Sequence, residues 1–168
     1  MSIEAVRTYL ASYGMADRIR ELPASSATVA LAAQALGTEE ARIAKSLAFL
    51  VDGKAILIVT AGDRKIDNHL YKLRFGTKAK MLTPEQTLAM IGHPVGGVCP
   101  FALPETVTVY CDESLKRFST VFPACGTTNS AMELSCEELY RVSGAVEWVD
   151  LCKPFAVPAE GENVSSIS

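Results

Sequence analysis

The sequence is poor in residues that bind metals or form disulfides. It contains two histidines, His69 and His93, and five cysteines at positions 99, 111, 125, 136 and 152, with no Cys-x-x-Cys pair among them. Zinc sites show such paired spacings, and disulfide frameworks show an even number of cysteines. We therefore expect no metal, no cofactor and no disulfide framework, with most thiols reduced and buried.

Long apolar runs and targeting segments are lacking as well. The longest apolar run, Ala55–Ala61, has the length of a strand, whereas a membrane-spanning helix needs about 20 apolar residues. The N-terminal Met-Ser-Ile-Glu-Ala-Val-Arg has neither the basic start nor the apolar block of a signal peptide. These absences predict a cytoplasmic protein with no membrane partner.

Positive charge is scarce overall but locally concentrated. Lys and Arg number 16 against 19 Asp and Glu, and this net charge of −3 argues against a protein that coats DNA or RNA. Residues 64–80 nevertheless carry +5, because six basic residues accompany one acid, Asp67, and the rest of the chain then carries −8. The six are Arg64, Lys65, Lys72, Arg74, Lys78 and Lys80. Such a patch fits one specific phosphate-bearing partner, although a solvated helix face is the equally weighted alternative.

Length and composition indicate one globular domain. The chain has 168 residues, of which 49% are apolar and 21% charged. We expect the domain to span residues 1–153. Residues 154–168 contain two prolines, a glycine, serines and glutamates, and are predicted to form a flexible C-terminal tail.

Local signals predict an α+β fold with a mixed sheet. The runs 46–51 and 54–61 are joined by Asp52-Gly53, which is a strong hairpin signal. Capping boxes at residues 83–86 and 135–138 each begin a helix, the first reaching about Ile91 and the second Val142. Further helices are expected over 3–13, 28–36, 39–44, 66–75 and 113–118, and further strands over 18–22, 79–82, 107–111, 121–124, 132–134 and 146–151. This irregular interleaving disfavours a regular doubly wound sheet.

The strand pattern places Lys45 among apolar side chains. Lys45 has the same parity as Ile43, Leu47 and Phe49, so the four share one face if the strand already includes residue 45. A buried, unpaired ammonium is costly, and a lysine held there is a candidate for anchoring an anion. The alternative is a strand-end lysine whose long side chain reaches water.

Two loops are rich in glycine and small polar residues. Residues 92–101, Gly-His-Pro-Val-Gly-Gly-Val-Cys-Pro-Phe, hold three glycines and two prolines and cannot form regular structure. Such a loop can present backbone N–H and C=O groups to a ligand, or can simply connect a helix to a strand. Residues 125–130, Cys-Gly-Thr-Thr-Asn-Ser, predict a polar turn that could hold a ligand hydroxyl or be an ordinary hairpin turn.

A thiol nucleophile is a further hypothesis. Cys99 follows His93 by six residues, but a Cys–His pair also needs spatial contact and a third group that orients the histidine. The spacing guarantees neither. The chain has no Gly-x-Ser-x-Gly elbow, and the glycines of 92–101 do not follow a dinucleotide or Walker pattern.

Segments spread over residues 6–151 resemble the YbaK / prolyl-tRNA synthetase-associated editing-domain family. Ala44-Lys45-Ser46-Leu47 resembles the family's lysine followed by Thr or Ser at the start of a strand, and residues 92–101 match its glycine–proline loop. The lysine and the loop together make the resemblance specific. The other segments are Thr28-Val29 with Ala35-Leu36-Gly37, residues 61–67, and Gly126 with Met132-Glu133-Leu134.

The resemblance implies a mixed, barrel-like sheet flanked by helices. It also implies an enzyme that hydrolyses the ester between a wrong amino acid and the terminal adenosine of a tRNA, using a positioned water and no metal. Lys45 would be the catalytic residue that anchors the tRNA 3′ end. The implied substrate-binding residues are Thr28, Ser46, Gly96, Gly97, Val98, Cys99, Pro100, Gly126 and Asn129, and Arg64, Lys65, Lys72 and Lys78 would contact the tRNA.

Two departures from the family's pattern leave the amino-acid preference open. Ala131 stands where some branches carry an acidic residue, and Cys99 stands where Ser or Thr is frequent. We expect a small amino acid, such as alanine, serine or cysteine, on tRNA-Pro. The partners would be a mischarged tRNA and a synthetase, with no DNA. A module of the same fold that binds tRNA or a nucleotide without turnover is the alternative.

Overall fold

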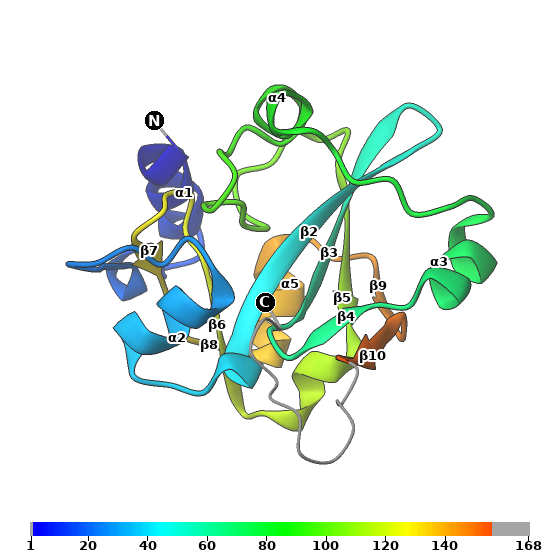
Figure 1. Ribbon diagram of the computed structural model, residues 1–168. Coiled ribbons are helices and arrows are strands. Elements are labelled where there is room, and N and C mark those ends of the chain that lie inside the picture. The colour runs from blue at the N-terminus through cyan, green and yellow to red at the C-terminus, as the bar shows by residue number, and fades with distance from the viewer. Residues whose placement is uncertain (1, 156–168) are drawn as a thin grey trace, which may run out of the picture.

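A curled, mixed six-stranded sheet forms the centre of the molecule (Figure 1). The computed structural model describes residues 2–155. The sheet has the order β8-β6-β2-β3-β5-β9, in which β2–β3 and β6–β8 are antiparallel and the other neighbours are parallel. Its strands are β2 (Ile43–Val51), β3 (Lys54–Ala61), β5 (Thr108–Asp112), β6 (Thr120–Pro123), β8 (Leu134–Ser135) and β9 (Glu147–Val149). The predicted α+β class with a mixed, barrel-like sheet is confirmed.

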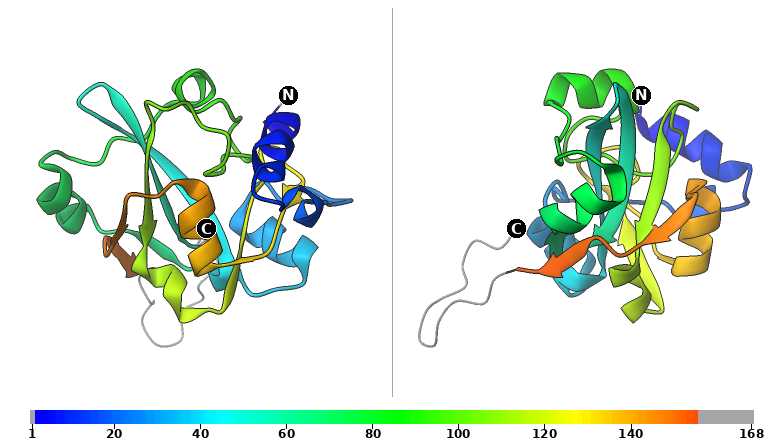
Figure 2. Two further views of the ribbon diagram at one scale, coloured as in Figure 1. Left: turned by 180° about the vertical axis from the view of Figure 1, so that it is seen from behind. Right: turned by 90° about the vertical axis from the view of Figure 1, so that its right-hand side faces the viewer.

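Helices pack on both faces of this sheet. Val6 and Leu10 of α1 (Ser2–Ala11) join Leu139 and Val142 of α5 (Cys136–Ser143) in the main core on one face, seen from behind in Figure 2. On the other face, Tyr71 of α3 (Asn68–Phe75) packs in a second cluster. The remaining helical elements are α2 (Val29–Leu36), α4 (Pro84–Gln86), the π-helical turn η3 (Thr87–Ile91), and the 3-10 turns η1 (Ala16–Arg18), η2 (Glu40–Arg42) and η4 (Glu113–Arg117).

Two small ribbons complete the fold. β1 (Arg20–Glu21) pairs with β7 (Ser130–Ala131), and β4 (Arg64–Ile66) pairs with β10 (Cys152–Pro154). The second ribbon corrects the boundary of the predicted tail, because Pro154 lies in β10 opposite Arg64. The rest of that predicted tail, residues 156–168, lies outside the described residues.

The signals that depend on a few neighbouring residues are confirmed. Asp52 and Gly53 have φ values of 51° and 78°, the left-handed pair that a tight hairpin requires. Thr83 and Ser135 each form the predicted capping box. Gly76 and Gly144 end α3 and α5 in the left-handed conformation.

Several predicted elements are shorter than expected or differ in type. The predicted strand 79–82 is reduced to a single bridge between Met81 and Phe49. The predicted helix 39–44 is the short turn η2, because β2 already begins at Ile43. The predicted strand 132–134 is replaced by β7 and β8, and α3 begins only at Asn68, after β4. For the changes that involve β2, β4, β7 and β8, pairing with a distant strand overrides the local pattern.

Candidate functional site

A cavity of about 400 Å³ opens beside the first half of β2. This volume lies in the range of small-molecule sites, about 300–1,000 Å³. Its walls come from residues 26–36, residues 43–48 of β2, residues 81–87 and the glycine loop at residues 95–98. Phe122, Ala124, Ser130 and Ala131 close it from the β6–β7 side. Segments far apart in the sequence therefore meet around one stretch of strand.

Within residues 2–155, the edge of β2 that faces this cavity has no strand partner over residues 45–47. The ladder with β6 ends at the pair Ala44–Pro123, and the Leu82 N–H next reaches β2 at the Ala48 carbonyl, 3.1 Å away. Along a strand, the N–H and C=O of one residue point to one side and those of the next residue to the other. The N–H and C=O of Ser46 therefore point to the same side as those of Ala48. The cavity therefore has an unpaired backbone donor and acceptor in its wall.

Ser46 also contributes a buried hydroxyl. Its Oγ is buried and has no hydrogen-bond partner within residues 2–155, and Ser46 is one of the residues that line the cavity. A buried polar atom without a partner is costly, and a ligand that supplies the partner recovers that cost. Ser46 therefore offers three polar groups, two from the backbone and one from the side chain, to a molecule in the cavity.

Lys45 lies beside Ser46 and lines the same cavity. It shares its face of β2 with Ile43 and Leu47, and it is half-buried, as its parity predicts. Burial lowers the pKa of Lys45, while nearby Cys152 and Asp63 act in the opposite direction. Its ammonium forms no ion pair or hydrogen bond with the described residues. A partly desolvated cation without a carboxylate partner is suited to an anionic ligand.

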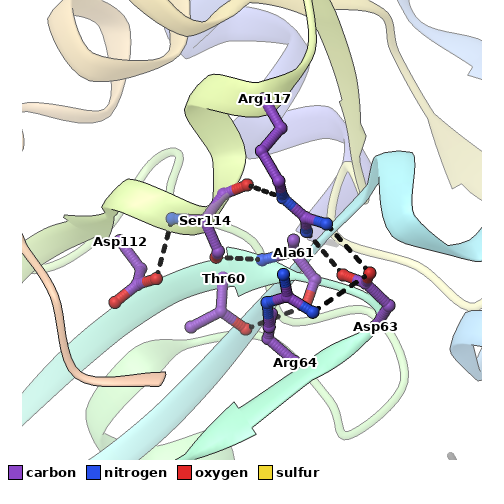
Figure 3. A network of polar contacts seen from close by, with 7 residues as sticks. All are labelled: Thr60, Ala61, Asp63, Arg64, Asp112, Ser114 and Arg117. Carbon is purple, nitrogen blue, oxygen red and sulfur yellow. Dashed lines mark hydrogen bonds and ion pairs between the residues drawn. The ribbon is translucent and has the colours of Figure 1, made fainter. Parts of the chain in front are cut away.

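Asp63 fails to pair with Lys45 because other groups hold it (Figure 3). Arg117 donates two hydrogen bonds to its carboxylate, at 2.6 and 3.0 Å, and these hold the pKa of Asp63 below its usual value. Arg64 lies 3.5 Å from the same carboxylate, and Arg117 also donates to the Ser114 carbonyl. No sequence pattern predicts this network, since Asp63 and Arg117 are 54 residues apart.

Packing against a turn fixes the glycine loop. A Cβ added to Gly97 would lie 2.7 Å from the Thr127 nitrogen, and one added to Gly96 would lie 3.1 Å from side-chain atoms of Ala27 and Thr128. Gly96 also has a φ of 92°, which side chains rarely adopt. The loop thus approaches the turn too closely for any other residue, and the contact positions Gly96 and Val98 in the cavity wall.

The turn at residues 125–130 also binds the segment that precedes α2. Asn129 exchanges hydrogen bonds with Leu22 through its side chain and its carbonyl, at 3.2 and 2.7 Å, and Ser26 N–H donates to the Thr128 carbonyl at 2.6 Å. Thr28 then caps α2 by accepting from Leu31 N–H, and it also lines the cavity. Asn129 is exposed and acts here as a tie between segments.

The predicted site residues are thus divided by the structure. Lys45, Thr28, Ser46, Gly96 and Val98 line the cavity, which brings five of them together. The other predicted substrate-binding residues, Gly97, Cys99, Pro100, Gly126 and Asn129, support the walls without lining them. Of the four basic residues, Arg64 and Lys65 lie on β4, Lys72 lies on α3 and Lys78 follows it, and none lines the cavity. The sequence did not single out Met81, Val95 or Phe122, whose only signal is their apolar character.

Cys99 is not an activated thiol. It is fully buried in the main core, and burial raises the pKa of its thiol to about 12. His93 Nε2 lies 3.5 Å from its Sγ but 2.8 Å from the Phe101 carbonyl, which can only accept, so Nε2 carries a proton. Burial also lowers the pKa of His93. The pair therefore lacks the free base that a thiol nucleophile needs.

Residues 2–155 contain neither a cluster of metal ligands nor a membrane-spanning helix. This part of the chain has no group of three or more His, Cys, Asp or Glu side chains placed to hold a metal ion. It also has no helix that is both long and apolar enough to cross a membrane.

The fold and the cavity define a class of protein. A curled mixed sheet carries a lysine with no ion pair among residues 2–155 at an open strand edge, and a tightly packed glycine loop lines the same cavity, which suits the site to an anionic group. Residues 24–142 match the family described as the aminoacyl-tRNA editing domain. The chain belongs to this family, as the lysine and loop motifs predicted.

The chain is similar to proteins of about its own length and to one part of longer proline–tRNA ligases. The chain is 50% identical over 154 residues to the uncharacterized protein YwhH of Bacillus subtilis, covering 91% of this chain and 98% of that protein. It is 33% identical over 118 residues to a proline–tRNA ligase of Geobacillus thermodenitrificans, covering 70% of this chain but 19% of the ligase. A solved structure described as a candidate trans-editing enzyme for prolyl tRNA synthetase has a TM-score of 0.82 and 31% identity, over 90% of this chain and 97% of that one.

Proposed function

We propose that this protein is a trans-acting aminoacyl-tRNA deacylase, which removes a small mischarged amino acid from tRNA. The observation that carries the proposal is the half-buried, unpaired ammonium of Lys45 at the cavity wall. A phosphate is the natural partner of such a cation. The 3′ end of a tRNA supplies phosphates close to the aminoacyl ester, so one anchored phosphate would bring the ester into the cavity.

The apolar part of the cavity supports a small amino acid. Ala32, Ala44 and Ala131 line it next to larger side chains such as Ile43 and Phe122, so the wall is apolar and includes several short side chains. An apolar wall of this kind accepts a small side chain but distinguishes closely related ones only weakly. The carrier tRNA-Pro is proposed from the likeness to proline–tRNA ligases and to the candidate trans-editing enzyme.

The reaction is hydrolysis of an ester. A water oxygen attacks the carbonyl carbon, the bond between that carbon and the ribose oxygen breaks, and the ribose oxygen takes a proton, which gives a free amino acid and an uncharged tRNA. We assign to Ser46 the donors that stabilise the negative oxygen formed during attack, through its N–H and hydroxyl groups. Lys45 and the glycine loop would position the ester, and positioning alone can provide a large rate enhancement.

The test is a panel of tRNAs charged with wrong amino acids, with mischarged tRNA-Pro foremost. We expect the protein to hydrolyse tRNA-Pro carrying a small amino acid, and we expect Lys45→Ala to lower kcat/KM by about 100-fold, as loss of a charged anchor does. Lys54→Ala is the matched control, since Lys54 is an exposed lysine on the neighbouring strand β3, outside the cavity. Equal rates in wild type and Lys45→Ala would contradict the role given to Lys45, and no hydrolysis across the panel would contradict the proposed enzyme.

A binding module without turnover is the second candidate. It is favoured by one observation, that no Asp, Glu or His is among the described residues that line the cavity, so no carboxylate or imidazole there can act as a general base. The cavity would then hold the end of a tRNA or a nucleotide through the same groups. Affinity for uncharged tRNA that falls steeply with salt, together with no hydrolysis on the panel, would favour this function.

A further inference from the structure

The last described residues of the chain return to Lys45. The backbone of β10 is paired with β4 in the register Cys152–Ile66, Lys153–Lys65 and Pro154–Arg64 (Figure 2, right). Just before it, the Leu151 N–H donates to the buried Asp112 carboxylate at 2.9 Å, and the Leu151 carbonyl accepts from Asp67 N–H at 2.8 Å. These bonds fix the start of β10, and the register with β4 then carries the backbone to Phe155.

The ring of Phe155 lies against the Lys45 ammonium. The Lys45 Nζ is 5.2 Å from the ring centroid, within the distance at which the face of an aromatic ring attracts a cation. Lys45 lines the cavity and Phe155 does not, so the ring contacts the ammonium without being part of the cavity wall. An aromatic face does not use up the N–H donors of an ammonium, so they remain free for an anion.

Core packing does not account for Phe155. Among the described residues, it belongs to none of the three apolar clusters and is not one of the half-buried side chains that pack on them. The nearest carboxylate on this side, Asp63, is engaged by Arg117 and Arg64. The long Lys45 side chain would otherwise be free to turn away toward water.

We propose that Phe155 is a positioning residue for Lys45, which makes the C-terminal strand β10 a working part of the site. Its ring holds the ammonium at the cavity mouth before a ligand arrives, so less side-chain freedom is lost when a phosphate binds. In its functional consequence this inference rests on the proposed role of Lys45 as a phosphate anchor. The geometric part, that the ring fixes the ammonium, stands independently of it.

The geometric part is tested by NMR on the full chain without ligand. The ring of Phe155 should shift the Hε protons of Lys45 upfield. We expect Phe155→Tyr to keep this shift and Phe155→Leu, which keeps apolar bulk but has no ring, to abolish it. An unchanged Lys45 signal in Phe155→Leu would overturn the proposal, whether or not the protein deacylates any tRNA.

The functional part is tested by binding of uncharged tRNA-Pro transcript. We expect Phe155→Leu to weaken binding by about 3- to 10-fold, as loss of a partly exposed cation–π contact does, and Phe155→Tyr to restore it. In deacylation assays the same loss should appear in KM, with kcat unchanged. Thermal unfolding of each variant checks that the fold is retained.

A double-mutant cycle separates positioning from a merely structural role. If the ring acts through the ammonium, Phe155→Leu has no further effect on tRNA binding once Lys45→Ala is present. An equal weakening in both backgrounds would overturn the proposal, because the ring would then act without Lys45. If wild type and Lys45→Ala bind tRNA equally, the proposed function fails, and the NMR result still decides whether the ring holds the lysine.

Discussion

The surroundings of Lys45 disfavour its charged form. Burial lowers the pKa of Lys45, and Cys152 and Asp63 only partly oppose this. Burial of the charged form therefore costs stability, and no ion pair with residues 2–155 offsets this cost. A cost of this kind is expected where a charge is needed for binding. The carboxylate that would relieve it, Asp63, is instead bound to Arg117.

The lowered pKa of Lys45 predicts opposite pH dependences for stability and for binding. Because the unfolded chain holds this proton more tightly, the free energy of unfolding should rise as pH increases through the folded-state pKa of Lys45 toward the ordinary lysine value. Affinity for uncharged tRNA should fall in that window, by up to about tenfold per pH unit, because the bound phosphate loses its cation.

Titration of tRNA binding and of denaturant unfolding between neutral and alkaline pH measures both effects. Lys45→Arg is the control, since an arginine stays charged throughout and should show neither trend. An affinity of the wild type that does not change until the ordinary lysine pKa would contradict this prediction.

Among the elements, the contact between the glycine loop and the turn at residues 125–130 determines the shape of the cavity. Gly97→Ala would force a Cβ to within 2.7 Å of the Thr127 nitrogen and 2.8 Å of backbone carbon atoms, which cannot give way as a flexible side chain can. We expect a loss of about 1–3 kcal/mol of stability from this overpacking. We also expect kcat/KM for deacylation to fall by at least about tenfold, since a displacement of about 1 Å in a positioned group is costly.

Gly76→Ala separates the two effects of that substitution. Gly76 has a φ of 76° and open space around its Cβ position, so its substitution strains the backbone without moving the loop. It should lower stability by about 1 kcal/mol and leave deacylation unchanged. Comparison of the melting temperature and kcat/KM of both variants is the measurement, and a Gly97→Ala variant as active as Gly76→Ala would show that the loop need not pack so closely.

Among the secondary-structure elements, the features that depend on a few neighbouring residues could be predicted from the sequence. The Asp52-Gly53 hairpin and the capping boxes at Thr83 and Ser135 follow from a few neighbouring residues, and all three are present. The ribbons β1–β7 and β4–β10 have strands of two or three residues, and their partners are more than 80 residues apart. No local pattern specifies such pairs, because tertiary contacts determine them.

The same division applies to the site. Lys45 could be predicted because strand parity places it among apolar side chains, and the glycine loop because three glycines exclude regular structure. The Phe155 ring reaches Lys45 only through the β4–β10 register, and Asp63 meets Arg117 across 54 residues. Contacts of this kind become visible only when the chain is folded.

On the scale of the whole molecule, the charge is uneven: one stretch is basic and would attract RNA, and the rest is acidic and would repel it. The net charge of −3 combines +5 in residues 64–80 with −8 elsewhere. In the fold, part of that positive stretch lies on β4, where Lys65 is directly opposite Lys153 of β10, the strand that leads to Phe155 and Lys45. Like charges directly opposite each other destabilise a strand pair. Lys153 lies 3.9 Å from the Asp67 carboxylate, which offsets part of this repulsion, and a phosphate between the two lysines would offset more of it.

This arrangement predicts that the affinity for tRNA depends only weakly on salt concentration and that three lysines account for the dependence. If Lys45, Lys65 and Lys153 contact three phosphates of a single-stranded tRNA end, the logarithm of the affinity should fall against the logarithm of the salt concentration with a slope of about −2. Lys65→Ala and Lys153→Ala should each make that slope shallower by about 0.7, with a uniform loss of affinity across tRNAs. Binding of uncharged tRNA-Pro at several salt concentrations measures the slope.

Lys116→Ala is the comparison, because Lys116 is a partly exposed lysine that lies over Trp148 on another part of the molecule. It should leave the slope unchanged. A slope that Lys65→Ala does not alter would place the RNA elsewhere on the surface. A slope several times steeper would indicate an extended duplex contact, which an acidic protein with one short basic ribbon cannot provide.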